Sequence, residues 1–340
     1  MKLWKSQGED SHVKSCVVAR QLGGIGDVLM MTPVLRGLKE KYGSDCHVTV
    51  ATDHYYLAGC IPLLLKHNPF IDAVERVNPH TFVTPPTRFV RSEFRGTPNE
   101  DIPHCILNAD LVIDLNVCCA MRETAQQPNV VDHRTDIWCQ AADVQPSDRR
   151  PILRLTEEER AEGRRWVEDR LGADGVRVGV ALSAHDPARN WPYSSQFAWE
   201  LQNQGYRVVT IDKQKSAHPQ VPAMLGLHVR QVAAAVEWLD VVVTPDTGIL
   251  HIAGALGVPV LGIFGPTNGA LRMREYAGDW IDGGLVAECS PCWYAHGCRR
   301  ESKDQRDWFY CLKRISKELV LLGLERLLSR LGKESASGIH

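Results

Sequence analysis

Short β-branched runs alternate with helical patterns in this chain, and that alternation constrains its fold more than any other feature. A run at 13–19 leads through a glycine-rich turn, Gly23 to Gly26, into a helical pattern, and a second run follows at 47–51. Strand, helix and strand at this spacing predict a βαβ unit with a right-handed crossover, which implies a parallel sheet. The helix is expected at about 28–42, with Pro33 as an alternative first residue of its regular part.

The alternation resumes after a polar segment at 143–150, which we interpret as a linker. Two α/β domains are therefore expected, residues 1–150 and 151–340, each a Rossmann-like doubly wound sheet. Ligands of such folds bind at the carboxyl ends of the strands, here in the cleft between the domains. In the second domain the pattern predicts strands at 176–182, 206–211, 240–244 and 258–264, and helices at 156–171, 194–204, 232–239 and 248–256.

Three further segments complete the pattern. A buried strand is predicted at 111–115 in the first domain. The polar, proline-bearing stretch at 80–104 is interpreted as a long loop or lid. The leucine-rich segment 313–331 predicts an amphipathic helix whose apolar stripe packs on the protein, with a membrane surface as the alternative partner.

The composition narrows the class of protein. Hydrophobic residues make up 44% and charged residues 24% of the 340 residues, values typical of a chain that buries ordinary cores. A formal net charge of −2 provides no basic field that would gather nucleic acid. Residues 1–14 are polar, and no apolar run approaches the ~20 residues of a membrane span. We therefore expect a cytoplasmic protein with at most peripheral membrane association.

The first glycine turn is followed at once by an acidic residue, Asp27. In a dinucleotide-binding fold a pyrophosphate would occupy this position at the helix start, and a carboxylate would repel it. A third glycine, three residues after Gly26, is also lacking. We interpret Asp27 as a general base at the edge of the cleft, with a helix cap as the alternative role.

A phosphate site is predicted in the second domain, where residues 244–248 (TPDTG) connect a strand to a helix. Backbone N–H groups at such a helix N-terminus attract anions, and Gly248 permits close approach. Thr247 adds a hydroxyl donor, and His251 lies one helical turn further on roughly the same face. A structural histidine is the alternative there. Residues 265–267 (GPT), after the next strand, should form the neighbouring rim.

A second source of positive charge follows the first strand of the second domain, at 183–192 (SAHDPARNWP). Arg189 is able to bind phosphate in a bidentate manner, and Ser183 offers a hydroxyl, although Arg189 also suits an ordinary surface position. Asp212, after the next strand, is a weaker candidate acceptor for a ribose hydroxyl. No Asp-x-Asp motif occurs. Arg189 and the helix N-terminus, rather than Mg²⁺, are therefore expected to hold the leaving-group charge.

Eleven cysteines fall into two groups. Seven are scattered over residues 16–139 and are expected to behave as small apolar side chains in a reducing compartment. The other four have the spacing C-x2-C-x5-C-x12-C, which suits a tetrahedral structural site for zinc or iron. Four reduced thiols in a loop-rich segment are the alternative. The four are Cys289, Cys292, Cys298 and Cys311.

Three motifs occur in order along the chain: GGIGDVLMMTPVL at 23–35, RNWP at 189–192 and DTGILHIAGALGVPVLGIFGPT at 246–267. Together they cover both predicted domains and resemble glycosyltransferase family 9, the ADP-heptose heptosyltransferases. The resemblance implies a GT-B fold and an inverting transfer that needs no catalytic metal. It also implies ADP-heptose or a related nucleotide sugar as donor, and a hydroxyl of a lipopolysaccharide core or of a protein as acceptor.

The resemblance also implies roles for individual residues. Asp27 matches the catalytic aspartate of the family, and the donor-binding loop of the family is matched by Asp246, Thr247, Gly248 and His251. Core-lipopolysaccharide heptosyltransferases typically carry lysine where this chain has Arg189, so the charge is retained with a different geometry. The autotransporter-protein type of the family holds iron at cysteines in the region that corresponds to residues 289–311.

A dinucleotide-dependent oxidoreductase that uses NAD(P) is the alternative function, since the first βαβ unit followed by Asp53 would suit one. The absorbance of a bound cofactor would distinguish the two enzymes. A metal-finger module for nucleic acid would need a basic surface, which the net charge does not provide. The sequence leaves the acceptor, the metal and the oligomeric state open.

Overall fold

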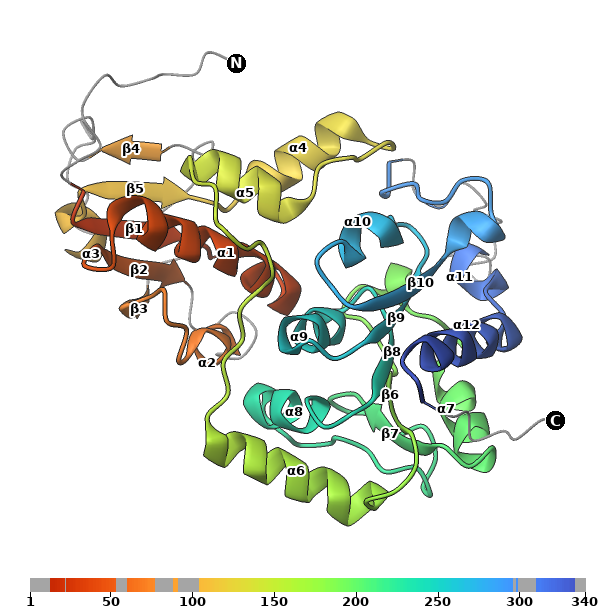
Figure 1. The fold of residues 1–340 in the computed structure, drawn as a ribbon. Coiled ribbons are helices and arrows are strands. Elements are labelled where there is room, and N and C mark those ends of the chain that lie inside the picture. The colour runs from red at the N-terminus through yellow and green to blue at the C-terminus, as the bar shows by residue number, and fades with distance from the viewer. Residues whose placement is uncertain are drawn as a thin grey trace.

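The computed structural model describes residues 13–21, 23–52, 60–76, 88–90, 104–295, 298 and 310–333. Figure 1 shows two α/β halves, each built around its own sheet, with the first half in red to yellow and the second in green to blue. The strands of the first sheet all precede 143–150, and those of the second all follow it. The predicted α/β, GT-B-like organisation is confirmed, and the domain boundary itself stays a prediction.

The first sheet has the strand order β3-β2-β1-β5-β4. Its central strands are parallel and buried, as expected for a sheet with both faces covered. The fourth strand is antiparallel to its neighbour and forms an edge. The strands are β1 (Ser15–Ala19), β2 (His47–Thr52), β3 (Ala73–Arg76), β4 (Arg88–Val90) and β5 (Leu111–Asp114).

Five helices accompany this sheet in the described residues: α1 (Ile25–Tyr42), α2 (Cys60–Leu65), α3 (His104–Asn108), α4 (Cys118–Gln126) and α5 (Arg134–Ala142). The helix α1 begins at Ile25, so the alternative start at Pro33 is wrong. A proline inside a helix removes one N–H donor and leaves the carbonyl four residues earlier without its partner. The hydroxyl of Thr32 donates to that carbonyl, on Leu29, at 2.7 Å. The helix therefore continues through the proline.

The second sheet is entirely parallel, in the order β10-β9-β8-β6-β7. Its strands are β6 (Arg177–Ala181), β7 (Arg207–Ile211), β8 (Val241–Pro245), β9 (Val260–Phe264) and β10 (Gly278–Asp282). Its α-helices are α6 (Glu157–Leu171), α7 (Ser194–Asn203), α8 (Val229–Val236), α9 (Gly248–Leu256), α10 (Gly269–Met273), α11 (Tyr310–Arg314) and α12 (Lys317–Arg330). Two 3₁₀ turns, η4 (Pro187–Arg189) and η5 (Gly283–Leu285), follow β6 and β10.

In each sheet the chain reverses its direction of travel across the strands at one point. That point lies between β1 and β5 in the first sheet and between β6 and β8 in the second. Such switch points leave a crevice at the carboxyl ends of the strands, where α/β sheets bind ligands. The loops after β1, β6 and β8, which contain the predicted site residues, all open there.

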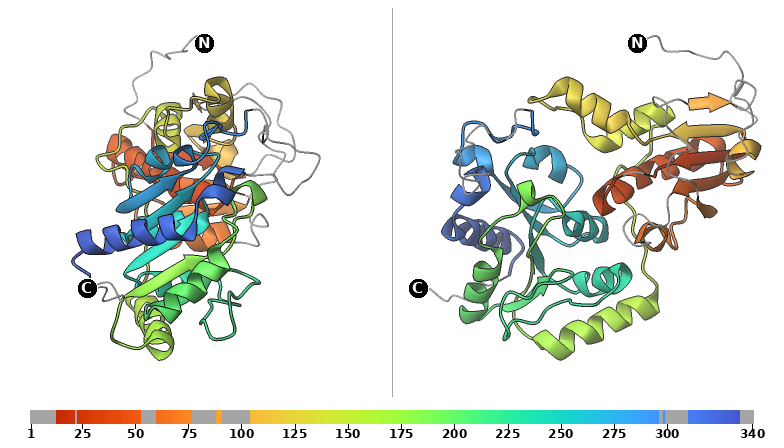
Figure 2. Two further views of the ribbon diagram at one scale, coloured as in Figure 1. Left: turned by 90° about the vertical axis from the view of Figure 1, so that its right-hand side faces the viewer. Right: turned by 180° about the vertical axis from the view of Figure 1, so that it is seen from behind.

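The two halves share one apolar core. The helices α1 and α2 of the first half contact α9 and α8 of the second, and their buried side chains belong to the same cluster. The opposite face of the second sheet carries a separate core beneath α7 and α12. Figure 2 shows these two helices on the side away from the first half. The prediction that the C-terminal helix packs on the protein is confirmed by its buried Val320, Leu324, Leu327 and Leu328.

Predicted strands that fall in the described residues begin and end within two residues of the observed ones. The segment 80–104 was expected to be a loop, but residues 88–90 form β4 and pair with β5, while 80–87 and 91–103 lie outside the described residues. The predicted helix at 313–331 is two helices, α11 and α12, separated by Ile315 and Ser316. Within the described residues, no helix is both long and apolar enough to cross a membrane.

Candidate functional site

Two glycines bring the halves into direct contact at the predicted site. A Cβ atom built on Gly26 would overlap the His251 ring, with Nε2 only 2.7 Å away. A Cβ atom on Gly248 would lie 2.9 Å from the Cβ of Ile25. Both glycines are therefore needed for the N-termini of α1 and α9 to meet. The structure thus joins the first glycine turn to the second-domain loop, more than 200 residues away along the chain.

Asp27 lies at this contact and its side chain is 13% exposed. Its Oδ2 accepts a hydrogen bond from the N–H of Gly24 at 2.8 Å, and its Oδ1 pairs with Arg134. The Arg20 guanidinium is 3.8 Å from Oδ2. Burial alone would raise the pKa of Asp27, but Arg134, Arg20 and the Gly24 N–H outweigh it and lower the pKa to about 2. The group is therefore a carboxylate at neutral pH, and it also caps α1.

A chain of charged side chains runs from Asp27 into the second half. Glu123 accepts two hydrogen bonds from Arg134, both of 2.7 Å, in a bidentate pair. Arg272, on α10, is 3.5 Å from Glu123 and 3.7 Å from Asp246. Arg272 is 5% exposed, so its charge is almost fully removed from water. Buried charges are retained where they are paired, and in this series the contact of Arg272 with Glu123 links the two halves.

Asp246 organises the basic side chains of the second half. Its Oδ2 accepts a hydrogen bond from the hydroxyl of Thr267 at 2.9 Å and lies 4.0 Å from Nη1 of Arg189. Burial would raise the pKa of this carboxyl, but the neighbouring His251, Arg272 and Arg189 hold it well below its usual range. The carboxylate thus lies within reach of both arginines, and the donor-binding role of Asp246 stays a prediction.

His251 lies between Asp246 and a tyrosine. Its Nε2 is 3.9 Å from Oδ1 of Asp246, and its Nδ1 is 2.7 Å from the hydroxyl of Tyr276. Burial lowers the pKa of His251 despite the attraction of Asp246. From these two contacts we assign the neutral ring a hydrogen on Nε2. The Nε2–H then points toward Asp246, and Nδ1 accepts a hydrogen bond from the hydroxyl of Tyr276.

The side chains of two other predicted donor-site residues, Thr247 and Ser183, form hydrogen bonds within the protein. Thr247 is the N-cap of α9, where its Oγ1 accepts from the N–H of Ile249 at 3.2 Å and lies 3.1 Å from Oγ1 of Thr244. Ser183 donates to the carboxylate of Asp212. The hydroxyls of Thr247 and Ser183 both lie at the predicted edge of the sheet. Ser183, however, bonds to Asp212 and not to Asp246 or its basic neighbours. Asp53, which the oxidoreductase alternative needs, lies outside the described residues.

Four buried nitrogen atoms in this region lack a hydrogen-bond acceptor among the described residues. Nε of Arg20 lies on the first half, beside Asp27, and the other three lie on the second half: Nε of Arg189, Nε of Arg272 and Nε1 of Trp293. The guanidinium of Arg272 lies over the Trp293 ring, 4.8 Å from its centroid. Unpaired buried donors are uncommon and costly, so a cluster of them indicates a missing acceptor such as an anionic ligand. Among the residues that carry these atoms, Arg189 is the one predicted from the sequence as a donor-binding residue.

Arg134, Glu123, Arg272 and Tyr276 were not predicted. Each is an isolated residue outside any motif, in a chain whose residues are 24% charged. Only the folded arrangement brings α4, α5 and α10 to the glycine turn.

The four clustered cysteines approach one another in the folded chain. Cys311 is buried and Cys289 is exposed. Burial raises the pKa of Cys311 to about 11, and the charges of the other three sulfurs add to this effect. Within the described residues, however, no three His, Cys, Asp or Glu side chains are arranged closely enough to hold a metal ion. The described part of this segment therefore shows no complete ligand set, and the metal site stays a prediction.

Comparison with known proteins identifies a family that the chain matches. The sequence matches the family described as glycosyltransferase family 9 (heptosyltransferase) over residues 113–293. It is 28% identical to lipopolysaccharide heptosyltransferase 2 of Escherichia coli (strain K12) over 116 residues, which cover 29% of this chain and 33% of that protein. The aligned part thus spans about a third of the curated relatives it matches.

Two solved structures have a similar fold. The glycosyl transferase family 9 protein from Veillonella parvula gives a TM-score of 0.66 at 18% identity, covering 96% of this chain and 100% of that one. The iron-containing dodecameric glycosyltransferase TibC from enterotoxigenic E. coli gives 0.64 at 16% identity, covering 94% and 77%. The matched family region takes in more than half of the chain, including Glu123, Arg134 and the Asp246 loop, and the chain belongs to glycosyltransferase family 9.

Proposed function

We propose that the protein is a glycosyltransferase that transfers heptose, or a related sugar, from an ADP-sugar to an acceptor hydroxyl with inversion at the anomeric carbon. One observation carries this proposal. A carboxylate of the first half, Asp27, stands across the contact between the halves from two arginines of the second half, the half-buried Arg189 and the buried Arg272, which neighbour Asp246 together with His251. Such a pairing supplies a base on one side and a diphosphate site on the other.

In the proposed reaction the acceptor oxygen attacks the anomeric carbon while the bond from that carbon to the β-phosphate oxygen breaks. The acceptor proton passes to Asp27, and ADP leaves with the bonding electrons. With a pKa of about 2, Asp27 is a weak base. It is therefore suited to take the proton late, once bond formation has made the hydroxyl acidic. Attack from the face opposite to the leaving group gives inversion.

The guanidinium groups of Arg189 and Arg272 are suited to stabilise the negative charge that grows on ADP. Their unpaired Nε donors support this role. Asp246 would hold both arginines and keep them apart from Asp27. These cations supply the charge that a divalent metal supplies in other transferases, and we propose that no catalytic metal takes part.

The donor and acceptor are proposed by analogy with relatives. TibC has been solved in complex with ADP-D-β-D-heptose, and the aligned curated relatives are lipopolysaccharide heptosyltransferases. We propose an ADP-heptose donor and a lipopolysaccharide-core saccharide or a protein as acceptor. TibC is also described as iron-containing, which supports a structural iron or zinc at Cys289, Cys292, Cys298 and Cys311.

A thermal-shift panel tests the proposal without knowledge of the acceptor. ADP-heptose, ADP-glucose, UDP-glucose, NAD and NADP are each added to the purified protein. A ligand at one hundred times its Kd stabilises the folded state by about 2.7 kcal/mol. We expect stabilisation by the ADP-sugars and no effect of NAD or NADP. The reverse pattern would establish the oxidoreductase alternative instead.

A further inference from the structure

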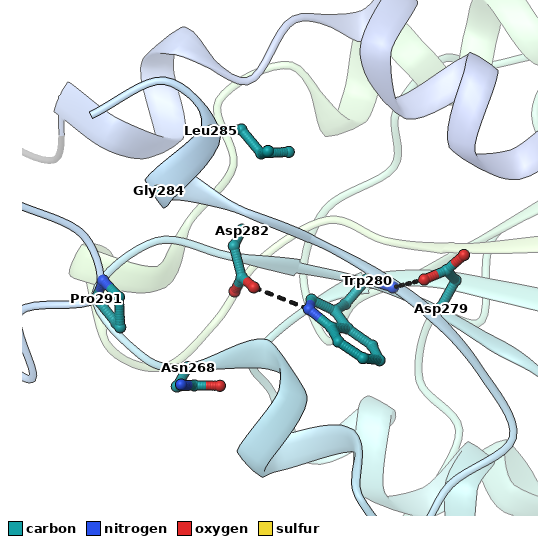
Figure 3. A pocket seen from close by; sticks show the side chains of 7 residues that line it. All are labelled: Asn268, Asp279, Trp280, Asp282, Gly284, Leu285 and Pro291. Carbon is teal, nitrogen blue, oxygen red and sulfur yellow. Dashed lines mark hydrogen bonds between the residues drawn. The ribbon is translucent and has the colours of Figure 1, made fainter. Parts of the chain in front are cut away.

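An open pocket of about 420 Å³ lies at the edge strand β10 (Figure 3). It lies where β9 and β10 end, at the carboxyl edge of the second sheet. None of the proposed catalytic or donor-binding residues lines it. Its lining residues are Asn268, Asp279, Trp280, Asp282, Gly284, Leu285 and Pro291.

An exposed tryptophan forms the platform of this pocket. Trp280 is 39% exposed, although it is one of the largest apolar side chains in the protein. Its indole N–H donates to Asp282 at 2.8 Å, and its backbone N–H donates to Asp279 at 2.9 Å (Figure 3). A Cβ atom on Gly269 would overlap the indole ring, so the glycine leaves room for it. The ring is thus held in one orientation before any ligand arrives.

Polar groups stand beside the ring. Asp282 accepts from the N–H of Gly269 at 2.9 Å as well as from the indole, and each carboxylate oxygen keeps a free lone pair. Asn268 caps α10 through its Oδ1, which accepts from the N–H of Leu271 at 3.0 Å. Its Nδ2 has no acceptor among the described residues and remains able to donate. Leu285, 69% exposed, adds apolar surface.

We propose that this pocket binds a neutral saccharide unit. The C–H face of a pyranose is weakly positive and packs against the negative face of an indole. Its hydroxyl groups donate to carboxylates and accept from amides, which Asp282 and Asn268 provide. A few fixed polar groups around an aromatic surface are the usual composition of a small-molecule site.

The charge of the pocket separates it from the proposed donor site. Asp279 is paired with Arg330 at 2.8 Å, whereas Asp282 has no cationic partner in the described part of the chain. A phosphate group would be repelled here and attracted to Arg189 and Arg272. The neighbouring Thr267 bonds to Asp246, so a bound saccharide would lie next to the donor loop. Its use as a subsite for the acceptor glycan rests on the proposed function; binding itself does not.

The test is saturation-transfer-difference NMR with methyl α-D-mannopyranoside as probe, without nucleotide sugar. We expect transfer to the probe with the wild-type protein and equally with Asp27→Asn, which lacks the proposed base. Trp280→Ala should weaken binding about tenfold, the scale of one lost aromatic contact. Trp280→Phe keeps an aromatic ring, and its affinity for the probe should lie between those of wild type and Trp280→Ala. Trp199→Ala, a tryptophan on α7 outside the pocket, is the matched control and should bind normally.

Mannose 6-phosphate is the second probe, and the part of its binding that Trp280→Ala removes should be weaker than that of the neutral glycoside. The proposal is overturned if no neutral glycoside shows transfer, or if Trp280→Ala binds as well as wild type. It would also be overturned if the phosphorylated probe bound as well as the neutral glycoside and lost this binding in Trp280→Ala. Thermal unfolding of each variant separates a lost contact from a lost fold. The assay contains no nucleotide sugar and measures no sugar transfer, so failure of saccharide binding is distinguished from failure of the transferase proposal, which the thermal-shift panel tests.

Discussion

Asp27 shows how one side chain can serve two purposes that appear as alternatives in the sequence. The carboxylate caps α1 through the N–H of Gly24, as the cap interpretation expects. Its other oxygen is held by Arg134 at the contact between the halves. A cap alone would not need Arg134, Arg20 and Arg272 to act on the same carboxylate. The cap therefore fixes the position of the group, and the proposed function uses its charge.

Substitution of Asp27 by asparagine tests its role as base. The amide keeps the size of the side chain and still accepts the hydrogen bond from Gly24, but it takes no proton. Turnover should fall by about 10²–10⁴-fold, the usual cost of losing a positioned base. The affinity for ADP, measured by calorimetry, should change little because the proposed donor site lies on the second half. A variant with near-normal kcat would leave Asp27 as a cap only.

The depressed pKa of Asp27 also predicts a pH dependence of stability. Its pKa is about 2 in the folded protein, against the ordinary 3.8. The folded state therefore binds fewer protons between these values, so the carboxylate stabilises the protein above about pH 4 and this contribution is lost as the pH falls toward 2. Two pH units correspond to roughly 2–3 kcal/mol. Urea unfolding should show Asp27→Asn less stable than wild type at pH 7, with a difference that narrows at acidic pH. A constant difference would contradict this.

Arg189 is the residue whose donor role can be tested most directly. Its buried Nε lacks an acceptor, so Arg189→Ala removes a donor without breaking a close hydrogen bond. Binding of ADP should weaken by roughly 1.5–3 kcal/mol, the scale of a charge-assisted hydrogen bond. Arg164→Ala, on the exposed surface of α6, removes the same charge elsewhere and is the control. Unchanged ADP affinity in calorimetry would remove Arg189 from the site.

At the residue scale, sequence motifs found one part of the site and could not find the rest. Asp27, Asp246 and His251 belong to recognisable strand–turn–helix segments, and the fold brings them together. Glu123 and Arg272 connect them, but each is a single charged residue on a short helix. No spacing rule links such residues, because their proximity arises only when the two halves pack.

At the scale of elements, the buried strands were predictable because a strand covered on both faces is a continuous apolar run. The strand β10 was missed, since its sequence GDWID is polar and lies at the edge of the sheet. The helix α8 begins at Val229, three residues before the predicted start, because His228 and Gln231 form a capping box. The helix α1 was predicted from about Val28, with Pro33 as an alternative start because proline is normally a boundary; the hydroxyl of Thr32 bonds to the carbonyl that the proline leaves without its N–H partner.

At the scale of elements, the testable prediction is a structural metal ion at the four clustered cysteines of residues 289–311. Protein purified without added metal should contain close to one equivalent of zinc or iron in elemental analysis. Serine at Cys292 should lower both the metal content and the melting temperature, because a structural metal contributes folding energy directly. Serine at Cys60, one of the scattered cysteines, is the control and should leave the metal content unchanged. Metal-free wild-type protein of normal stability would return all four to ordinary thiols.

At the scale of the whole molecule, the relative placement of the halves decides what the site can do. An apolar core joins them, together with polar contacts. Arg274 forms an ion pair with Asp136 at 2.5 Å, and Nε2 of Gln127 donates a hydrogen bond to the carbonyl of Trp293 at 2.7 Å. The sequence predicted two halves and a cleft, but it contains no signal for how closely they approach. With the His251 ring against Gly26, a nucleotide sugar enters between the loops only if the halves separate. The structure therefore shows the arrangement in which these loops are in contact.

A single methyl group should shift that arrangement. In Gly26→Ala the new Cβ would overlap the His251 ring, which Tyr276 and Asp246 hold in place. The ring is not the free end of a flexible side chain, so the halves should be kept apart while each stays folded. Small-angle scattering should give a radius of gyration above the about 20 Å expected for a compact chain of this length. Transfer should fall sharply while ADP binding to the second half persists. Gly24→Ala is the matched control, because a Cβ there meets nothing within 4 Å and the backbone φ is −83°. If the two variants scatter and react alike, the contact of Gly26 with His251 does not control closure.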